Sequence, residues 1–190
     1  MARRYPALED AHREFIAAQQ MFFVATADRE GYINLSPKGL DTLRVLDASH
    51  VAWLNLTGSG NETAAHLRSD GRMTLMFCAF QGDPLILRLY GRAEAVHRRD
   101  KRWKTLATGL PSMPGARQIM LMNIELVQTS CGFGVPLYDF RGQRELLPRW
   151  AENKGRAGLE QYWREKNAVS LDGRKTGIVE LNLGNGEEEP

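Results

Sequence analysis

The 190-residue chain has little of several features that would assign it to a specialised class of protein. Its two cysteines, Cys78 and Cys131, are too few for a disulfide framework or a zinc site, so a reducing cytoplasm is the simplest setting. The 25 Lys and Arg residues nearly balance the 23 Asp and Glu residues, which argues against a protein that coats nucleic acid. No apolar run reaches the roughly 18 residues of a membrane helix, so we expect no membrane span.

Recognisable catalytic patterns are also scarce. The four histidines lie far apart without metal-ligand spacing, so we expect no metal site: His12, His50, His66 and His97. There is no Ser-His-Asp order and no paired carboxylate, and Cys131 has no base beside it in sequence. We therefore name no catalytic residue. The basic first residues lead into a charged segment rather than an apolar one, so we expect no secretion signal.

The chain does have enough apolar residues, 43%, for one hydrophobic core. We expect a single domain over residues 1–190, with a core at about 21–130 and a C-terminal helical extension at about 140–170. The tail from Asn182 onward looks frayed.

Hydrophobic periodicity predicts six or seven strands and only a few helices. The predicted helices cover 8–20, 62 to about 68, 99–109 and 146–167, and the predicted strands cover 21–27, 32–36, 43–46, 51–56, 72–80, 85–96 and 119–129. Because most of the strands are joined by turns, we expect an antiparallel sheet and a mainly β (α+β) fold. A closed or split β-barrel with helices outside it satisfies this pattern.

One candidate ligand site lies where the second predicted strand ends. Strand alternation places Asn34 and Ser36 on one face, and Lys38 follows Pro37. A hydroxyl, an amide and a cation that converge at a strand end can hold a phosphate. The alternative is a solvated turn, which these residues alone do not exclude.

A second candidate is the glycine-rich segment 57–63. Thr57, Ser59, Asn61 and Thr63 supply hydroxyl and amide groups next to glycines, at a predicted helix start that favours anions. Ser59 and Glu62 also have the spacing of a capping box, so an ordinary capped loop is the alternative.

The third candidate is Arg88, which interrupts an apolar strand. Alternation places it on the same face as Ile86 and Tyr90. It either contacts a ligand or points outward with its stem along the sheet.

Taken together, three segments resemble the pyridoxamine 5′-phosphate oxidase-like flavoproteins, the FMN-binding split-barrel family. They are FFVATADREGYINLSPKG, VAWLNLTGSGNETAAHLRSDGRMTLMF and LILRLYGRAEAV, in the family's order and spacing. The remaining segments, among them CGFGVPLYDF and YWREKNAVSLDG, are similar to an uncharacterised bacterial subgroup.

The resemblance implies a six-stranded antiparallel split β-barrel that forms a homodimer, with FMN in clefts shared between the two chains. It implies that the FMN phosphate lies at Lys38 and Ser36 and at the helix start formed by Thr57, Asn61, Glu62 and Thr63. The oxidases carry Arg and Lys at that helix start, where this chain has Glu62 and Thr63, so less positive charge is available here.

The resemblance therefore implies an FMN-dependent oxidoreductase that acts on a small molecule. The oxidases' C-terminal Trp…Arg-x-His-x-Arg motif is absent, which argues against oxidation of pyridoxamine phosphate itself. Two alternatives remain, a non-catalytic flavin- or haem-binding carrier or sensor and an enzyme that has lost its cofactor.

Overall fold

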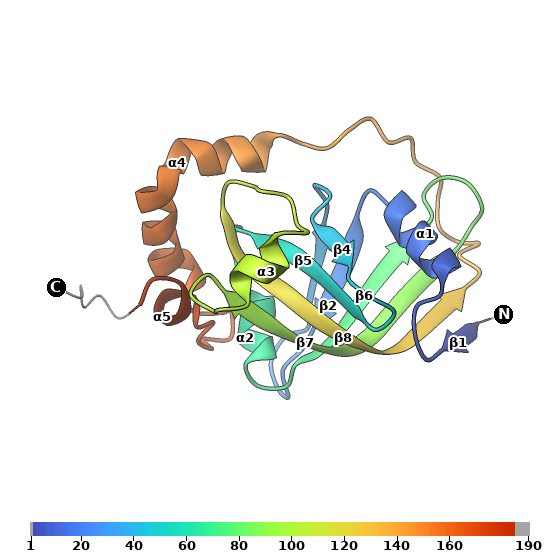
Figure 1. Cartoon of the computed structure of the whole chain (residues 1–190), viewed down its shortest axis with the longest axis horizontal. Helices are drawn as coiled ribbons and strands as arrows, with labels where there is room; N and C mark the ends of the chain where they lie inside the picture. Colours follow the sequence, from blue (N-terminus) through green and yellow to red (C-terminus); the bar gives the residue numbers. More distant parts are fainter. Residues whose placement is uncertain (1, 185–190) are drawn as a thin grey trace.

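The computed structural model describes residues 2–184 and is built on one antiparallel sheet of eight strands (Figure 1). Seven strands follow one another across the sheet in the order β3 (Asn34–Lys38), β2 (Phe22–Thr26), β6 (Arg72–Cys78), β7 (Ile86–His97), β8 (Ala116–Ser130), β5 (His50–Leu56) and β4 (Leu43–Val45). The short strand β1 (Arg3–Tyr5) pairs with the far end of β8.

The chain connectivity forces this sheet to curl. Strands β3 and β4 form its two edges, yet only residues 39–42 connect them. Such a connection spans at most roughly 18 Å, whereas seven flat strands would separate the edges by roughly 29 Å. The sheet therefore bends into a split barrel, as predicted.

The sheet has eight strands, compared with the six or seven predicted from periodicity and the six that the resemblance implied. The predicted strand at 43–46 is the three-residue strand β4, and the three-residue strand β1 was not predicted. The other predicted strands and helices are present, with ends shifted by a few residues.

The barrel interior is filled by aromatic and aliphatic side chains. Phe22 on β2 stacks on Phe77 of β6 with ring centroids 5.7 Å apart, and it meets the edge of Trp53 on β5. Strand β2 has the alternating burial of a strand with one face toward the core: its first, third and fifth residues are buried.

The two longest strands, β7 and β8, pair over most of their length with a bulge after Tyr90. Gly91 lies at this bulge, where an added Cβ would come within 2.0 Å of the Asn123 carbonyl oxygen. Only glycine permits this close approach, so the bend of the barrel depends on it.

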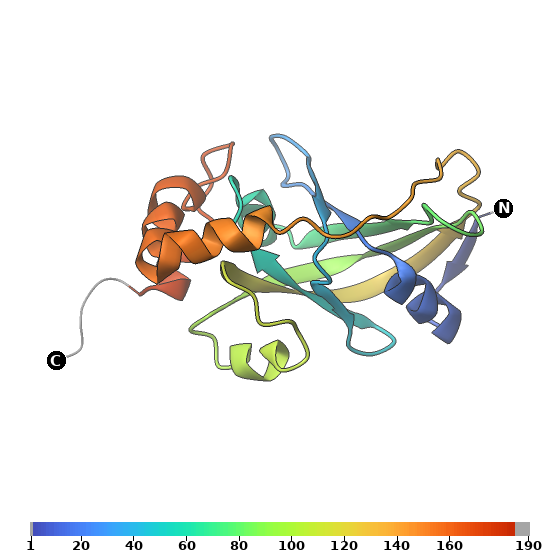
Figure 2. The same ribbon diagram turned by 90° about the horizontal axis from the view of Figure 1, so that it is seen from above.

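The helices lie outside the sheet (Figures 1 and 2). They are α1 (Asp10–Ala18), α2 (Glu62–Leu67), α3 (Trp103–Ala107), α4 (Leu146–Tyr162), the π-helix η1 (Trp163–Asn167) and α5 (Ile178–Asn182). After β8 the chain returns along one edge of the molecule before α4 begins, and α4, η1 and α5 gather at one end of the barrel. We call residues 146–184 the C-terminal extension.

The C-terminal end of the extension is more ordered than the sequence suggested. Asn182 is buried, and its side-chain amide donates to the Arg117 carbonyl oxygen at 2.7 Å, so the prediction of fraying from this residue is wrong there. The rest of that predicted tail, 185–190, lies outside the described residues. None of the helices in the described part of the chain has the length and apolar character to cross a membrane.

Candidate functional site

A cavity of about 540 Å³ opens at the end of the barrel that faces the extension. Strands β3 and β5, the loop before α2, and the start of β8 supply its wall, and the extension adds Leu147 and Leu171. Nine of the ten predicted site residues line it: Asn34, Ser36, Pro37, Lys38, Thr57, Ser59, Asn61, Glu62 and Thr63. The structure thus brings the first two sequence candidates into one site.

Strand β3 presents its polar residues to this cavity through simple alternation. Asn34, Ser36 and Lys38 are partly buried, whereas Leu35 is 63% exposed on the other face. Asn34 donates a hydrogen bond to the Thr63 hydroxyl oxygen at 3.2 Å. The Ser36 hydroxyl is buried and has no hydrogen-bond partner among the described residues.

The glycine-rich loop is held from two sides. The Thr57 hydroxyl donates to the Gly115 carbonyl oxygen at 2.7 Å and accepts from the Trp163 indole nitrogen at 2.9 Å. Gly115 has a φ of +75°, and an added Cβ would lie 2.9 Å from the Cβ of Ala151 on α4. Glycine here lets the extension approach the cavity wall closely.

Asn61 has an unusual environment in this loop. It is 2% exposed, and neither its side-chain nitrogen nor its oxygen has a partner within the described chain. The predicted capping box of Ser59 and Glu62 is wrong, because Asn61 is the N-cap residue and the Glu62 carboxylate accepts from the Leu171 backbone N–H at 2.9 Å. Asn61 therefore caps α2 without a side-chain hydrogen bond, and its buried amide remains unpartnered within residues 2–184.

Sequence reasoning missed Arg117, which lies at the start of β8 and in the cavity wall. Arg117 is 3% exposed and donates to the Asn167 side-chain oxygen at 2.6 Å and to the Gly60 carbonyl oxygen at 2.8 Å. Its Nε has no partner within residues 2–184. The available signal was a cation among otherwise buried positions of a strand, at the sequence Ala116-Arg117-Gln118.

The electrostatics of the site follow from burial. Removal from water lowers the pKa of Arg117 to about 9, which still leaves the guanidinium charged at neutral pH. Burial, and then the charge of Arg117, lowers the pKa of Lys38 to about 8. Neither cation forms an ion pair with a carboxylate in the described part of the chain.

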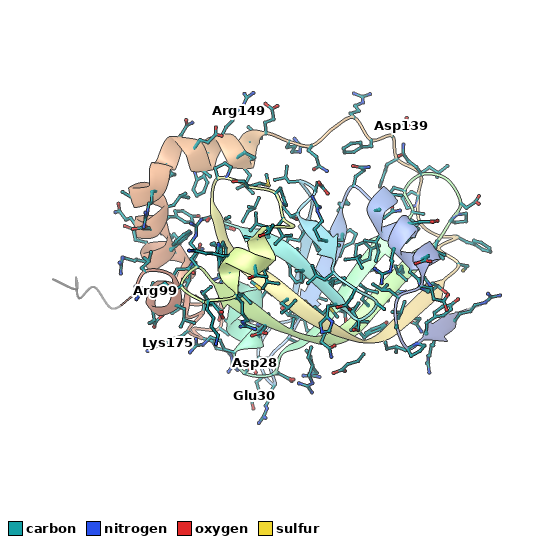
Figure 3. The ribbon with its side chains drawn as sticks, viewed as in Figure 1. Asp28, Glu30, Arg99, Asp139, Arg149 and Lys175 are labelled. Atoms are coloured by element: carbon teal, nitrogen blue, oxygen red, sulfur yellow. The ribbon has the colours of Figure 1, made fainter. Side chains whose placement is uncertain are left out.

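This arrangement is suited to an anion. Lys38, Arg117 and Glu62 line one cavity, so its cations outnumber its carboxylates, and the unpartnered side chains of Ser36 and Asn61 belong to the same wall. The low positive charge expected at the helix start is offset by Arg117, which comes from a strand instead. The exposed side chains of Asp139 and Arg149, in contrast, lie at the outer edge of the molecule (Figure 3).

The third candidate, Arg88, does not line this cavity. It shares a face of β7 with Ile86 and Tyr90, as alternation predicted, and donates to the Ser130 hydroxyl oxygen at 3.2 Å. Within one chain the structure therefore separates Arg88 from the other nine predicted residues.

Comparison with known proteins gives two kinds of match. The profile of the family described as pyridoxamine 5′-phosphate oxidase matches residues 8–131. The chain is 39% identical over 187 residues to ustO of Aspergillus flavus, described as a pyridoxamine 5′-phosphate oxidase family protein, and the match covers 89% of this chain and 75% of ustO.

Solved structures show a similar fold at low sequence identity. A variant of HupZ from Group A Streptococcus superposes with a TM-score of 0.52 at 21% identity, covering 64% of this chain and 98% of HupZ. A Lactobacillus delbrueckii protein described as a candidate pyridoxamine 5′-phosphate oxidase gives a TM-score of 0.51 at 21% identity, covering 65% of this chain and 94% of that protein.

Proposed function

Because the chain belongs to the pyridoxamine 5′-phosphate oxidase family, we propose that it binds FMN in the cavity beside β3 and acts as an FMN-dependent oxidoreductase on a small molecule. In this proposal the FMN phosphate lies at Lys38 and Arg117.

One observation carries the proposal: the two cations of the cavity lack carboxylate partners, and buried polar groups beside them lack any partner in the described chain. A buried polar group or charge without a partner is costly to maintain. A phosphate bound in the cavity would supply the counter-charge that Lys38 and Arg117 lack as ion pairs. The cavity is also within the usual size range of small-molecule sites.

The flavin, when bound, supplies the redox chemistry, and the chain supplies position and shelter from water. Lys38 and Arg117 would hold the charged end of the ligand. Leu147 and Leu171 of the extension, with Leu54 of β5, line the cavity and would shield the bound ligand from water. We assign no proton-transfer role to any side chain.

We also propose that the protein is a homodimer whose flavin sites use both chains. Apolar residues beside β3 are exposed in the single chain: Tyr32 at 70%, Ile33 at 77% and Leu35 at 63%. Further exposed apolar residues lie in the segment after β8, including Phe133 at 82% and Leu137 at 74%. A second copy of the chain would cover such surfaces. Light scattering should give twice the chain mass, whereas a monomer with full flavin occupancy would contradict the shared site.

The absorption spectrum of the purified protein tests flavin binding, and anaerobic addition of NADH or NADPH tests redox activity. We expect a flavin spectrum, either as purified or after incubation with FMN, and bleaching of that spectrum on reduction. Protein that takes up no flavin overturns the proposal. Protein that binds FMN but is reduced by neither these donors nor a deazaflavin donor is a carrier or sensor, not an oxidoreductase.

A further inference from the structure

We propose that Asn167, in the C-terminal extension, is a positioning residue of the anion site: it holds the Arg117 guanidinium in the cavity wall without neutralising its charge, and so makes the site selective for a phosphorylated flavin. This inference rests on the proposed function and concerns a part of the chain beyond the matched family region, which ends at residue 131.

The extension is joined to the cavity wall by side-chain hydrogen bonds. Trp163 donates to Thr57 at 2.9 Å, and the Asn167 amide donates to the Gly58 carbonyl oxygen at 3.0 Å. The Leu171 backbone N–H donates to the Glu62 carboxylate at 2.9 Å. Each of these contacts reaches a residue that lines the cavity, so the extension forms part of the site's support.

Asn167 is the member of this group that reaches a cation. It lies at the end of η1, is fully buried, and accepts from Arg117 Nη1 at 2.6 Å. Its own carbonyl oxygen accepts from the Thr176 hydroxyl at 2.6 Å, which fixes the backbone. Because the side-chain nitrogen binds Gly58 and the oxygen binds Arg117, the amide has one orientation, and it links the loop to the cation.

The neutrality of this partner is the central point. A carboxylate in the same place would form an ion pair with Arg117 and cancel much of its attraction for a phosphate. Asn167 and the Gly60 carbonyl both orient the guanidinium as uncharged acceptors. The positive charge therefore remains available to a ligand in the cavity, while the geometry of the guanidinium is fixed.

The extension also contains a matched control. Asn182 of α5 is buried as well, and its amide donates to the backbone carbonyl oxygen of the same arginine, Arg117, at 2.7 Å. Its side-chain oxygen accepts from the Arg98 backbone N–H at 2.9 Å. Asn182 thus ties the extension to β8 through the same residue without touching the guanidinium.

The test is calorimetric titration of apoprotein with FMN and with riboflavin, using wild type, Asn167→Asp and Asn182→Asp. Aspartate has nearly the same shape as asparagine, but Asn167→Asp both adds a charge beside Arg117 and removes the N–H that donates to the Gly58 carbonyl oxygen. Asn182→Asp removes a corresponding N–H, the one that donates to the Arg117 backbone carbonyl oxygen, so it controls for the lost donor. We expect its FMN dissociation constant to rise by about ten-fold or more, as for the loss of a charge-assisted contact. Its riboflavin dissociation constant should change little, and Asn182→Asp should leave the ratio of the two constants as in wild type.

Several outcomes would overturn the inference. If Asn167→Asp keeps the wild-type ratio of FMN to riboflavin affinity, Asn167 is only a structural tie. If Asn182→Asp shifts the ratio equally, the effect is one of general charge rather than of position. Should Asn167→Asp fail to fold by circular dichroism, Asn167→Ala replaces it, and an unchanged ratio there has the same meaning. Wild-type protein that binds neither flavin overturns the proposed function itself, a result distinct from these.

Discussion

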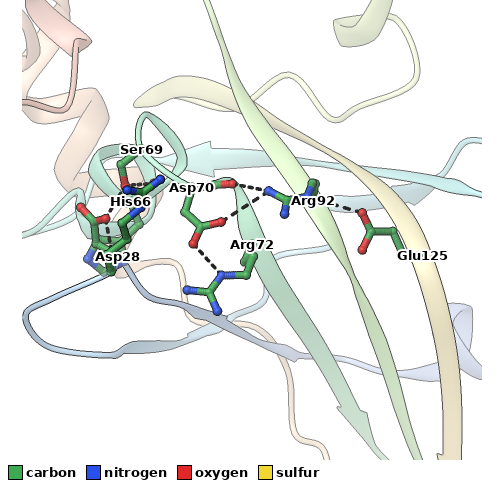
Figure 4. A network of polar contacts seen from close by, with 8 residues as sticks. Asp28, His66, Ser69, Asp70, Arg72, Arg92 and Glu125 are labelled. Atoms are coloured by element: carbon green, nitrogen blue, oxygen red, sulfur yellow. Dashed lines mark hydrogen bonds and ion pairs between the residues drawn. The ribbon is translucent and has the colours of Figure 1, made fainter.

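Two groups of cations on the same sheet have opposite environments. Arg72 on β6 and Arg92 on β7 share Asp70, which accepts from Arg72 Nε at 2.6 Å, and Arg92 also faces Glu125 (Figure 4). These two arginine side chains are 60% and 59% exposed. Arg117, in contrast, is 3% exposed and has only neutral acceptors.

This difference in exposure and pairing distinguishes cations that belong to the surface of the fold from cations that a ligand could contact. Exposed cations are solvated and paired, so their presence needs no ligand, and each pair contributes at most about 1 kcal/mol to stability. A buried cation without an ion-paired carboxylate is costly to maintain, and for Arg117 the attraction of Glu62 offsets only part of the effect of burial. We therefore attribute the pairs around Asp70 to the surface of the fold, and we take Lys38 and Arg117 as the basis of the anion site proposed above.

The largest effect is expected from Arg117→Met, which replaces the buried cation with an apolar side chain. FMN affinity should fall by about 100-fold or more, because a charged hydrogen bond in a shielded site contributes about 1.5–3 kcal/mol and several such bonds to the phosphate are lost. Titration calorimetry with FMN and riboflavin measures this. Arg92→Met is the matched control. An equal loss of FMN affinity in that variant would contradict the distinction between the buried Arg117 and the exposed Arg92.

Lys38→Ala should have the next largest effect. Lys38 is only partly buried, so we expect FMN affinity to fall by roughly ten- to a hundred-fold, less than for Arg117→Met, with riboflavin affinity nearly unchanged. Lys104→Ala, on the exposed face of α3, serves as the control. Unchanged FMN affinity in Lys38→Ala would identify Lys38 as a surface lysine and leave the phosphate to Arg117 and Asn61.

The pH dependence of binding sharpens this prediction. The pKa of Lys38 is lowered to about 8, so the side chain is charged at pH 7 and mostly neutral at pH 9. The phosphate binds the charged form, so FMN affinity should decrease as pH rises through 8, by up to about ten-fold between pH 7 and 9. The decrease should be much smaller in Lys38→Ala, where only the onset of Arg117 titration near pH 9 remains, and it should be absent for riboflavin. An FMN affinity that stays constant over this range in wild type would contradict a role for this lysine.

The smallest effect is expected at the exposed pairs. Asp70→Asn removes the charge that Arg72 and Arg92 share, and the free energy of unfolding should decrease by about 1 kcal/mol or less, because solvent screens these pairs. Urea denaturation measures the change, which should shrink further at high salt. FMN affinity should be that of wild type, and a marked loss of affinity would show that the two groups of cations are coupled.

Much of the site was accessible from local sequence pattern. Alternation along residues 32–36 correctly grouped Asn34 with Ser36, and the glycine-rich segment 57–63, predicted as a candidate ligand loop, lines the same cavity. Both features depend on residues close together in the chain, where the period of a strand or the start of a helix constrains the side chains directly.

The missing part depends on pairing between distant segments. Arg117 reaches the cavity because β8 pairs with β5, with Gln118 opposite Asn55, and because Asn167 of the extension returns to hold it. No local period signals either contact. The mistaken capping box has the same origin, because Leu171 gives Glu62 a different partner from far along the chain.

The ratio of riboflavin to FMN dissociation constants for the wild-type apoprotein tests the central claim most directly, since the two ligands differ only in the phosphate. With charge-assisted contacts from both Lys38 and Arg117, the account predicts that FMN binds at least about 100-fold more tightly. Equal affinities would contradict it, because the two cations would then have no phosphate to hold.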